Sequence, residues 1–345
     1  MGTLKTMRAF KDMPPANQRR AHTAAAGAHG YTLVEFMVAV TLGMMLILVV
    51  SSVFISGGKS YREDDRSARM QENGRFAMKV LTEDLSMTGM WGQVTSSSGI
   101  TSTIGATCVG SVGITFDSTN PVNVIDQATG SGANSSYSCI TAANVYDPAA
   151  IVAGTPRPDV LVIKRVLGGK SEATTGLSEA YLEITDGNGK LVQTTPESFV
   201  GGSEYWQFMP RIYYIRKNSG DSAPTLVAKY LNNAAMGAGD ESPLVDGVEN
   251  MQVEFGIDTN EDGVADQYKT APSTTELVNV VNARIYLLVR STTYEPGDPL
   301  NTKTYNLGST VIPAQNDRYQ RRVFSTTVSL RNPANLAAAG RRTTL

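Results

Sequence analysis

The sequence has few of the residues on which metal sites and acid–base chemistry usually depend. Among 345 residues there are two histidines, His22 and His29, and two cysteines, Cys108 and Cys139. Beyond residue 30 no imidazole remains for a catalytic triad, a general base or a zinc site, and two cysteines cannot form a cysteine-only zinc site. The formal net charge is −2, so the basic excess of a general nucleic-acid binder is also missing.

Known catalytic motifs are missing as well. The sequence contains no dinucleotide-binding glycine fingerprint, no P-loop lysine and no nucleophile elbow, so we do not expect an enzyme. The composition is otherwise globular, because 41% hydrophobic and 18% charged residues exclude disorder throughout the chain. The length is sufficient for one large domain or two smaller ones with a real core.

The first 60 residues predict a membrane segment. Residues 1–30 carry a formal charge of +4, and without them the remainder carries about −6. The 20 residues from Phe36 to Ile55 are uncharged. As a helix rising ~1.5 Å per residue, they span the ~30 Å hydrocarbon core of a bilayer. Positive charge ahead of this span places the N-terminus in the cytoplasm and the bulk of the chain on the other side.

Two features do not fit an ordinary anchor. Glu35 lies at the start of the apolar run, where a carboxylate costs roughly 2.5–3.5 kcal/mol on insertion scales and therefore needs a partner or a function. The polar stretch also ends abruptly at Gly30. A plain signal anchor with an incidental glutamate and a secretory signal peptide cut near Ser56-Gly57 are the alternatives, but the 30-residue polar leader is too long for the start of an ordinary signal peptide.

The sequence Gly30-Tyr31-Thr32-Leu33-Val34-Glu35, followed by an apolar helix, resembles the prepilin signal of type IV pilins and type II secretion pseudopilins. The resemblance implies that prepilin peptidase cuts between Gly30 and Tyr31 and that the new amino terminus is methylated. It also implies that Glu35 pairs with the terminal amine of a neighbouring subunit during assembly. Tyr31 departs from the phenylalanine that is usual in the family, but it is another bulky aromatic residue.

An amphipathic pattern follows from Ser60 to about Met87. One apolar stripe recurs at spacings of seven, four and four residues, which predicts a helix packed on a head domain; the stripe consists of Met70, Ala77, Leu81 and Leu85. We expect Arg62 and Arg66 to pair with acids one turn away on the charged face. Gly57-Gly58 is expected to bend or loosen the helix, and Gly89 to end it.

These patterns predict four parts of the chain. Residues 1–30 form a leader that is removed, 31–57 a transmembrane and assembly helix, 58–90 its amphipathic continuation, and 91–345 a periplasmic or extracellular head.

Residues 93–158 are rich in Ser, Thr, Gly, Ala and Asn and show no long periodic pattern, which predicts a variable surface region. Cys108 and Cys139 lie inside this region, and we interpret them as one disulfide in an oxidising compartment. Such a bridge would contribute roughly 3–4 kcal/mol in the chain-entropy model. Two free thiols or a redox pair are the alternative, although the spacing is not that of a redox motif.

From Asp159 onward the sequence predicts strands punctuated by Gly, Pro and Asn. Residues 181–184 and 191–193 flank the turn Asp186-Gly187-Asn188-Gly189 and predict a hairpin. Residues 251–255 alternate strictly, which predicts one buried face and one wet face. The other expected strands are 160–163, 211–216, 226–230, 283–289 and 323–328. The expected fold class is α+β, with a long N-terminal helix packed on a mostly antiparallel sheet, as in type IV pilins.

One segment is suited to calcium. Asp258, Asn260, Asp262 and Asp266, with the Val264 carbonyl, match positions 1, 3, 5, 9 and 7 of a calcium loop. Lys269 stands where the bidentate glutamate should be, so the loop is incomplete. The alternative is an acidic glycine turn between two strands.

Several segments of the head, together with Met70 to Gly89, resemble the PilW family of minor pilins. They are residues 247–256, 284–291, 321–328 and 330–332. The resemblance implies a minor pilin that primes type IV pilus assembly with other minor pilins and lies at the fibre tip. The mature chain of 315 residues is larger than is usual for a major pilin.

The implied partners are prepilin peptidase, other minor pilins, the major pilin, the inner-membrane assembly platform and membrane lipid, with no nucleic acid. The implied location is the bacterial inner membrane with a periplasmic head, then the pilus. A type II secretion pseudopilin and a tip adhesin that binds through residues 93–158 are alternatives. No cofactor other than calcium is suggested by the sequence.

Overall fold

The computed structural model describes residues 30–94, 100–104, 120–126, 145–172, 178–231 and 240–332. The chain divides into two compact units, Met1–Lys59 and Ser60–Leu345. The first element, α1, is a helix of 54 residues from Leu33 to Ser86. It continues through Gly57-Gly58, and Gly89 follows its end with a φ of 71°, a conformation that favours glycine.

The head is built from β-sheets, and two of them form the core beside α1. One is a five-stranded antiparallel sheet in the order β2-β3-β7-β8-β9. Its strands are β2 Val122–Ile125, β3 Val160–Ile163, β7 Arg211–Arg216, β8 Thr225–Tyr230 and β9 Glu241–Asp246. The other is a four-stranded antiparallel sheet in the order β11-β10-β12-β15. Its strands are β11 Gln267–Lys269, β10 Val248–Ile257, β12 Val280–Arg290 and β15 Arg321–Ser329.

A third sheet of four strands has the order β1-β5-β4-β6. Its strands are β1 Ile100–Ser102, β5 Asn188–Thr194, β4 Glu179–Thr185 and β6 Glu204–Gln207. The expected hairpin is β4 and β5, and its turn residues Asp186 and Gly187 have φ angles of 50° and 77°. The strand pair β1–β5 is parallel. The remaining elements are the hairpin β13 Tyr305–Leu307 and β14 Thr310–Ile312, the helix α2 Thr274–Leu277, and the 3-10 turns η4 Pro148–Ala150 and η5 Pro196–Ser198.

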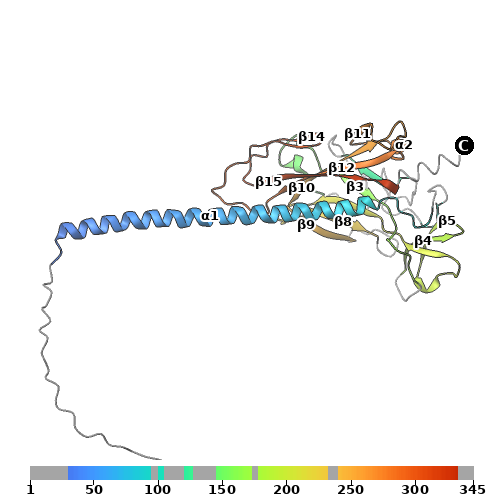
Figure 1. Ribbon diagram of the computed structural model, residues 1–345, viewed down its shortest axis with the longest axis horizontal. Helices are drawn as coiled ribbons and strands as arrows, with labels where there is room; N and C mark the ends of the chain where they lie inside the picture. Colours follow the sequence, from blue (N-terminus) through green and yellow to red (C-terminus); the bar gives the residue numbers. More distant parts are fainter. Residues whose placement is uncertain are drawn as a thin grey trace, which may run out of the picture. The chain divides into compact units, whose positions relative to one another are not determined.

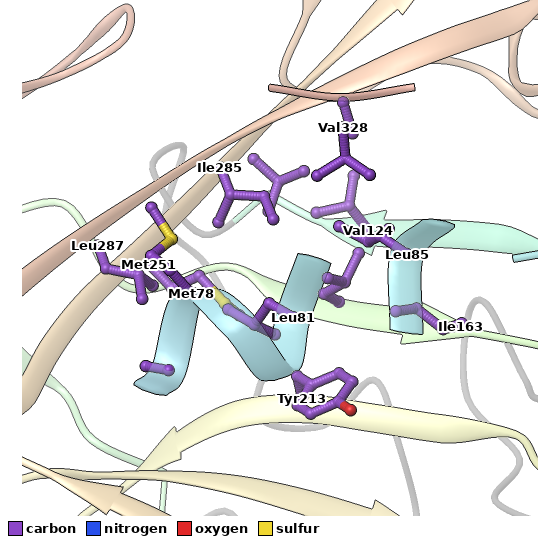
Figure 2. Packing of buried hydrophobic residues seen from close by; sticks show 14 of the residues in the cluster. Met78, Leu81, Leu85, Val124, Ile163, Tyr213, Met251, Ile285, Leu287 and Val328 are labelled. Atoms are coloured by element: carbon purple, nitrogen blue, oxygen red, sulfur yellow. The ribbon is translucent and has the colours of Figure 1, made fainter. Parts of the chain in front are cut away.

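The apolar stripe of α1 lies in the largest core cluster. Met70, Ala77, Leu81 and Leu85 are all buried, which confirms the expected stripe. Figure 2 shows Met78, Leu81 and Leu85 of the helix among residues of both core sheets, with Ile163 and Tyr213 from one sheet and Ile285 and Leu287 from the other. In Figure 1 the C-terminal part of α1 runs beside β8, β10 and β15. The helix therefore completes the hydrophobic core of the head.

The expectation of a half-wet strand at 251–255 was wrong. All ten residues of β10 are buried. One face packs in the main core, and the polar face is covered by the chain before β3, where the Asn250 side chain donates to Pro156 O (2.9 Å) and Gln252 to Arg157 O (2.9 Å). The alternating pattern therefore correctly separated an apolar face of β10 from a polar one, but long-range contacts bury the polar face that the pattern assigned to solvent.

The region at 93–158 also contributes more structure than its composition suggested. Its described residues include β1, β2 and η4, and Val122 of β2 lies in the main core. Cys108 and Cys139 lie outside the described residues, so their bridge stays a prediction.

Candidate assembly helix and its seat on the head

The start of α1 carries the residues that the sequence singled out for processing and assembly. Gly30, Tyr31 and Glu35 are all exposed. Thr32 caps the helix, because its side-chain oxygen accepts a hydrogen bond from the Glu35 N–H at 3.2 Å. Glu35 thus lies in the first turn, where the helix dipole favours a negative charge. Cleavage after Gly30 would leave this cap in the mature chain.

The first half of α1 is apolar and exposed. It contains an 18-residue window of mean hydropathy 2.6, none of it buried, so its length and composition are those of a helix that can cross a membrane. Hydroxyl side chains here bond within the helix. Thr41 donates to Met37 O (3.0 Å) and Ser52 donates to Val49 O (2.8 Å). Internal pairing of this kind removes much of the cost of placing a hydroxyl in hydrocarbon.

The second half of α1 is seated on the head through close backbone contact. A Cβ atom placed on Gly74 would lie 2.3 Å from the Phe324 ring of β15. Only glycine lets the ring approach the helix backbone this closely. The neighbouring Asn73 donates to Asp246 O at 2.9 Å, whereas Glu72 is exposed. Asn73 is therefore part of the seat.

A buried polar cluster fixes the C-terminal end of α1. The Asp84 carboxylate accepts a hydrogen bond from Arg165 at 2.7 Å and lies 3.3 Å from Arg211. It also accepts a hydrogen bond from the Tyr213 hydroxyl. Burial, and next the charge of Asp84, raises the pKa of Tyr213 well above its usual value, so this phenol stays protonated. Because Asp84 and its partners are buried together, the cluster specifies one rotation of the helix against the sheet.

Two arginines fix the other end of the seat. Arg62 lies 3.5 Å from Glu295, and Arg66 donates to Asp298 at 2.5 Å. The hydrogen bond with Asp298 raises the pKa of Arg66. The sequence predicted acids one turn away as partners, and the charge of Glu63, three residues before Arg66, does contribute to the raised pKa of Arg66. The acids that they contact come from the chain between β12 and β13, because tertiary folding brings those acids onto the helix face.

Sequence reasoning did not find these clusters. A signal existed for Asp84, which lies three residues beyond Leu81 and beside Leu85, and therefore on the buried face. A carboxylate on a buried face needs a buried partner. No spacing in the sequence indicated Arg165, Arg211 or Asp298, which lie far from α1 along the chain.

The acidic loop uses its carboxylates to bond its own backbone. Asp258 accepts from Glu261 N (2.6 Å) and Gly263 N (2.8 Å), and Asp266 accepts from Thr259 N (2.7 Å). Asn260 bridges Asp262 and Asp266 through its amide, at 3.2 Å and 3.3 Å. Hydrogen bonds from Thr259 lower the pKa of Asp266. Within the described part of the chain no group of three or more His, Cys, Asp or Glu residues forms a metal site.

These hydrogen bonds within the loop fit the alternative interpretation, an acidic glycine turn between two strands. Val264 is exposed beside Gly263, whose φ of 86° makes the turn. Calcium binding stays a prediction, which calorimetric titration of the protein with calcium would test, with Asp258→Asn as the variant.

Comparisons with known proteins found a family match and a similar solved structure. The family model described as type IV pilus-assembly protein W (PilW) matches residues 212–332, from β7 to the residues after β15. Among solved structures, the chain is similar to a type IV-like pilin, TTHA1219 from Thermus thermophilus, with a TM-score of 0.36 and 13% sequence identity. That match covers 77% of this chain and 98% of the other. No curated protein matches significantly.

The long apolar helix and the mostly antiparallel head form an α+β fold. The family match shows that residues 212–332 of the head are similar to the PilW family.

Proposed function

We propose that this protein primes type IV pilus assembly together with other minor pilins and is located at the fibre tip. Prepilin peptidase cuts it between Gly30 and Tyr31, and the new amino terminus is methylated. Before assembly the protein waits in the inner membrane with its head in the periplasm, near the assembly platform. Glu35 then pairs with the terminal amine of the adjacent subunit, which is another minor pilin or the major pilin.

One observation supports this proposal above the others. A single helix combines an exposed apolar half, which starts with a capped turn containing Glu35, with a second half fixed to the head at Arg66, Gly74 and Asp84. Such a helix can join a bundle of neighbouring apolar helices while its second half remains part of the head. The PilW match from 212 to 332 lies on the sheets that hold this second half.

The test is a gene deletion complemented with wild type, Glu35→Ala or Glu83→Ala. Glu83 is a matched control because it lies on the same helix, on the exposed face of the head-bound half. We expect surface pili, counted by electron microscopy, to disappear on deletion and to return with wild type and Glu83→Ala but not with Glu35→Ala. Immunoblots of membranes verify that all variants accumulate.

Other outcomes would replace the proposal. Normal pili with a secretion defect would indicate a type II secretion pseudopilin. Normal pili with lost attachment would indicate a tip adhesin. The N-terminal residue of the purified protein, determined by mass spectrometry, tests the processing step separately. A terminus other than methylated Tyr31 would contradict that step.

A further inference from the structure

The four-stranded sheet of the core ends at β15, and one edge of this strand is open. Among the described residues β15 pairs with β12 and with no other strand. It runs for nine residues, Arg321–Ser329, and it contains no proline and no shift in its register with β12. A long, regular edge of this kind offers a row of backbone donors and acceptors to any other extended chain.

The other sheet edges in the described part of the chain are short or guarded. The edge strands β1, β2, β6, β11, β13 and β14 have only three or four residues each. β9 has six residues, but Pro243 lies inside it, and its register with β8 shifts between Leu226 and Val227. Short length, proline and irregular pairing are common means of preventing the addition of a foreign strand. β15 has none of the three, so its open edge is an exception in this head.

The hydrogen-bond register shows which backbone groups face the open edge. Leu330 N donates to Val281 O at 2.8 Å, and Ser291 N donates to Gln320 O at 2.9 Å. The even-numbered residues of β15 therefore bond to β12, and the N–H and C=O groups of the odd-numbered residues point away from it. Within the described chain the outward groups make no backbone hydrogen bond; they belong to Val323, Ser325, Thr327 and Ser329.

The charges around this edge have one sign. Residues 318–332 contain four arginines and no acidic residue. Arg321 is paired with acids inside the head. Arg322 at the start of the edge and Arg331 just beyond its end are both exposed. A strand with carboxylates near both of its ends would place opposite charges beside these two arginines, which stabilises a strand pair.

The same charges disfavour two other occupants of the edge. If two copies of the chain paired antiparallel through β15, Arg322 of each copy would lie at the same end as Arg331 of the other. Like charges across neighbouring strands destabilise the pair. Residues 333–345 add Arg341 and Arg342 and no acidic residue, so the C-terminal segment of the chain itself is no better matched.

We propose that the open edge of β15 binds an extended strand of another protein, and that this strand carries carboxylates near both of its ends. The strand pairs with the outward backbone groups of β15 and extends the sheet beyond it. Exposed Ser325, Thr327 and Ser329 place little demand on the partner's side chains. Backbone hydrogen bonds and the terminal charges therefore determine the binding. The inference rests on the register and charge of β15 and does not depend on the priming or tip role.

The experiment uses the full chain in detergent micelles, with a probe strand fused to its C-terminus through a Gly/Ser linker. The probe has nine residues, as β15 does, and consists of alternating Thr and Val between two terminal glutamates. In the matched control probe, lysines replace the glutamates. The linker keeps either probe at an effective concentration in the millimolar range.

The readout is hydrogen–deuterium exchange of the backbone amides, resolved to single residues by mass spectrometry with fragmentation. We expect the outward amides of Ser325, Thr327 and Ser329 to exchange at least about fivefold more slowly with the glutamate probe than with the lysine probe. The amide of Thr326 already bonds to β12 and serves as the internal control, so its exchange should be the same with both probes.

The double substitution Arg322→Glu/Arg331→Glu reverses the charge at both ends of the edge. Both arginines are exposed, and circular dichroism verifies that the variant folds. In this variant the lysine probe should slow the exchange of the outward amides, and the glutamate probe should not.

Exchange that neither probe slows would overturn the proposal, because the edge would then not accept a strand. Equal slowing by both probes would contradict the acidic partner. Slowing that increases with protein concentration would indicate pairing between copies of the chain instead. Other pilus proteins are absent from the micelles, so failure of the proposed assembly function leaves these results unchanged.

Discussion

The effect of Gly74→Ala on the free energy of unfolding is expected to change sign when the residue at position 324 is changed. In an isolated helix, alanine is about 1 kcal/mol more favourable than glycine. Here the added Cβ would lie 2.3 Å from Cε2 and 2.4 Å from Cζ of Phe324. Overpacking of this kind costs roughly 1–3 kcal/mol, even though the half-buried ring can shift outward. The net expectation is a loss of about 0–2 kcal/mol in the free energy of unfolding.

In a Phe324→Ala background the same Gly74→Ala change should stabilise the head by about 1 kcal/mol, because the helix preference is then unopposed. The coupling energy between the two positions is therefore expected to be about 1–3 kcal/mol. The assay is urea unfolding of the four variants in detergent micelles, followed by the fluorescence of Trp91 and Trp206, which both pack in the head. Equal stabilisation by Gly74→Ala in the wild-type and Phe324→Ala backgrounds would refute the claim that glycine is required here for the close approach of the Phe324 ring.

Three further predictions concern other parts of the head. Asp84→Asn should lower the free energy of unfolding by roughly 3–5 kcal/mol in the same assay, because it removes the charge opposite the buried Arg165. The control Glu83→Gln changes an exposed carboxylate and should lower the free energy of unfolding by less than about 0.5 kcal/mol. Equal effects of the two substitutions would contradict the role of the buried cluster. The hydrogen bond from Lys269, and next those from Ser273, lowers the pKa of Glu276 to about 2. The ionised Glu276 should therefore stabilise the folded state fully above the ordinary glutamate pKa of 4.5, and this stabilisation should be lost as the pH falls through about 2. An NMR titration of the Glu276 carboxyl group with a midpoint near 4.5 would contradict this. Peptide mapping of unreduced protein should recover one Cys108–Cys139 peptide, and two alkylated cysteines would show free thiols instead.

Much of the architecture could be predicted because its patterns are local. The helix, its buried stripe, the β4–β5 hairpin and the strands β3, β7, β8, β12 and β15 follow from periodicity and turn residues. The short strands β1, β2, β6, β11, β13 and β14 were missed, because three or four residues give too little periodicity to read. The longer strand β9 was missed as well. Partner strands far along the chain decide whether such segments pair.

The seat of the helix was only half predictable. The apolar stripe indicated which face of α1 is buried, since burial depends on the spacing of apolar residues. The sequence did not indicate Glu295 and Asp298 as the ion-pair partners of Arg62 and Arg66, because neighbours on a helix are visible in a sequence and residues brought together by folding are not.

The sequence by itself determined the parts whose physics is local. These are the charge step and uncharged run that predict a membrane segment, Glu35 at its start, and the helix that continues into the head. Only the tertiary structure decided that both faces of β10 are covered and which acids hold the helix. These features depend on contacts between residues that are distant along the chain, and a single sequence does not indicate which distant residues meet.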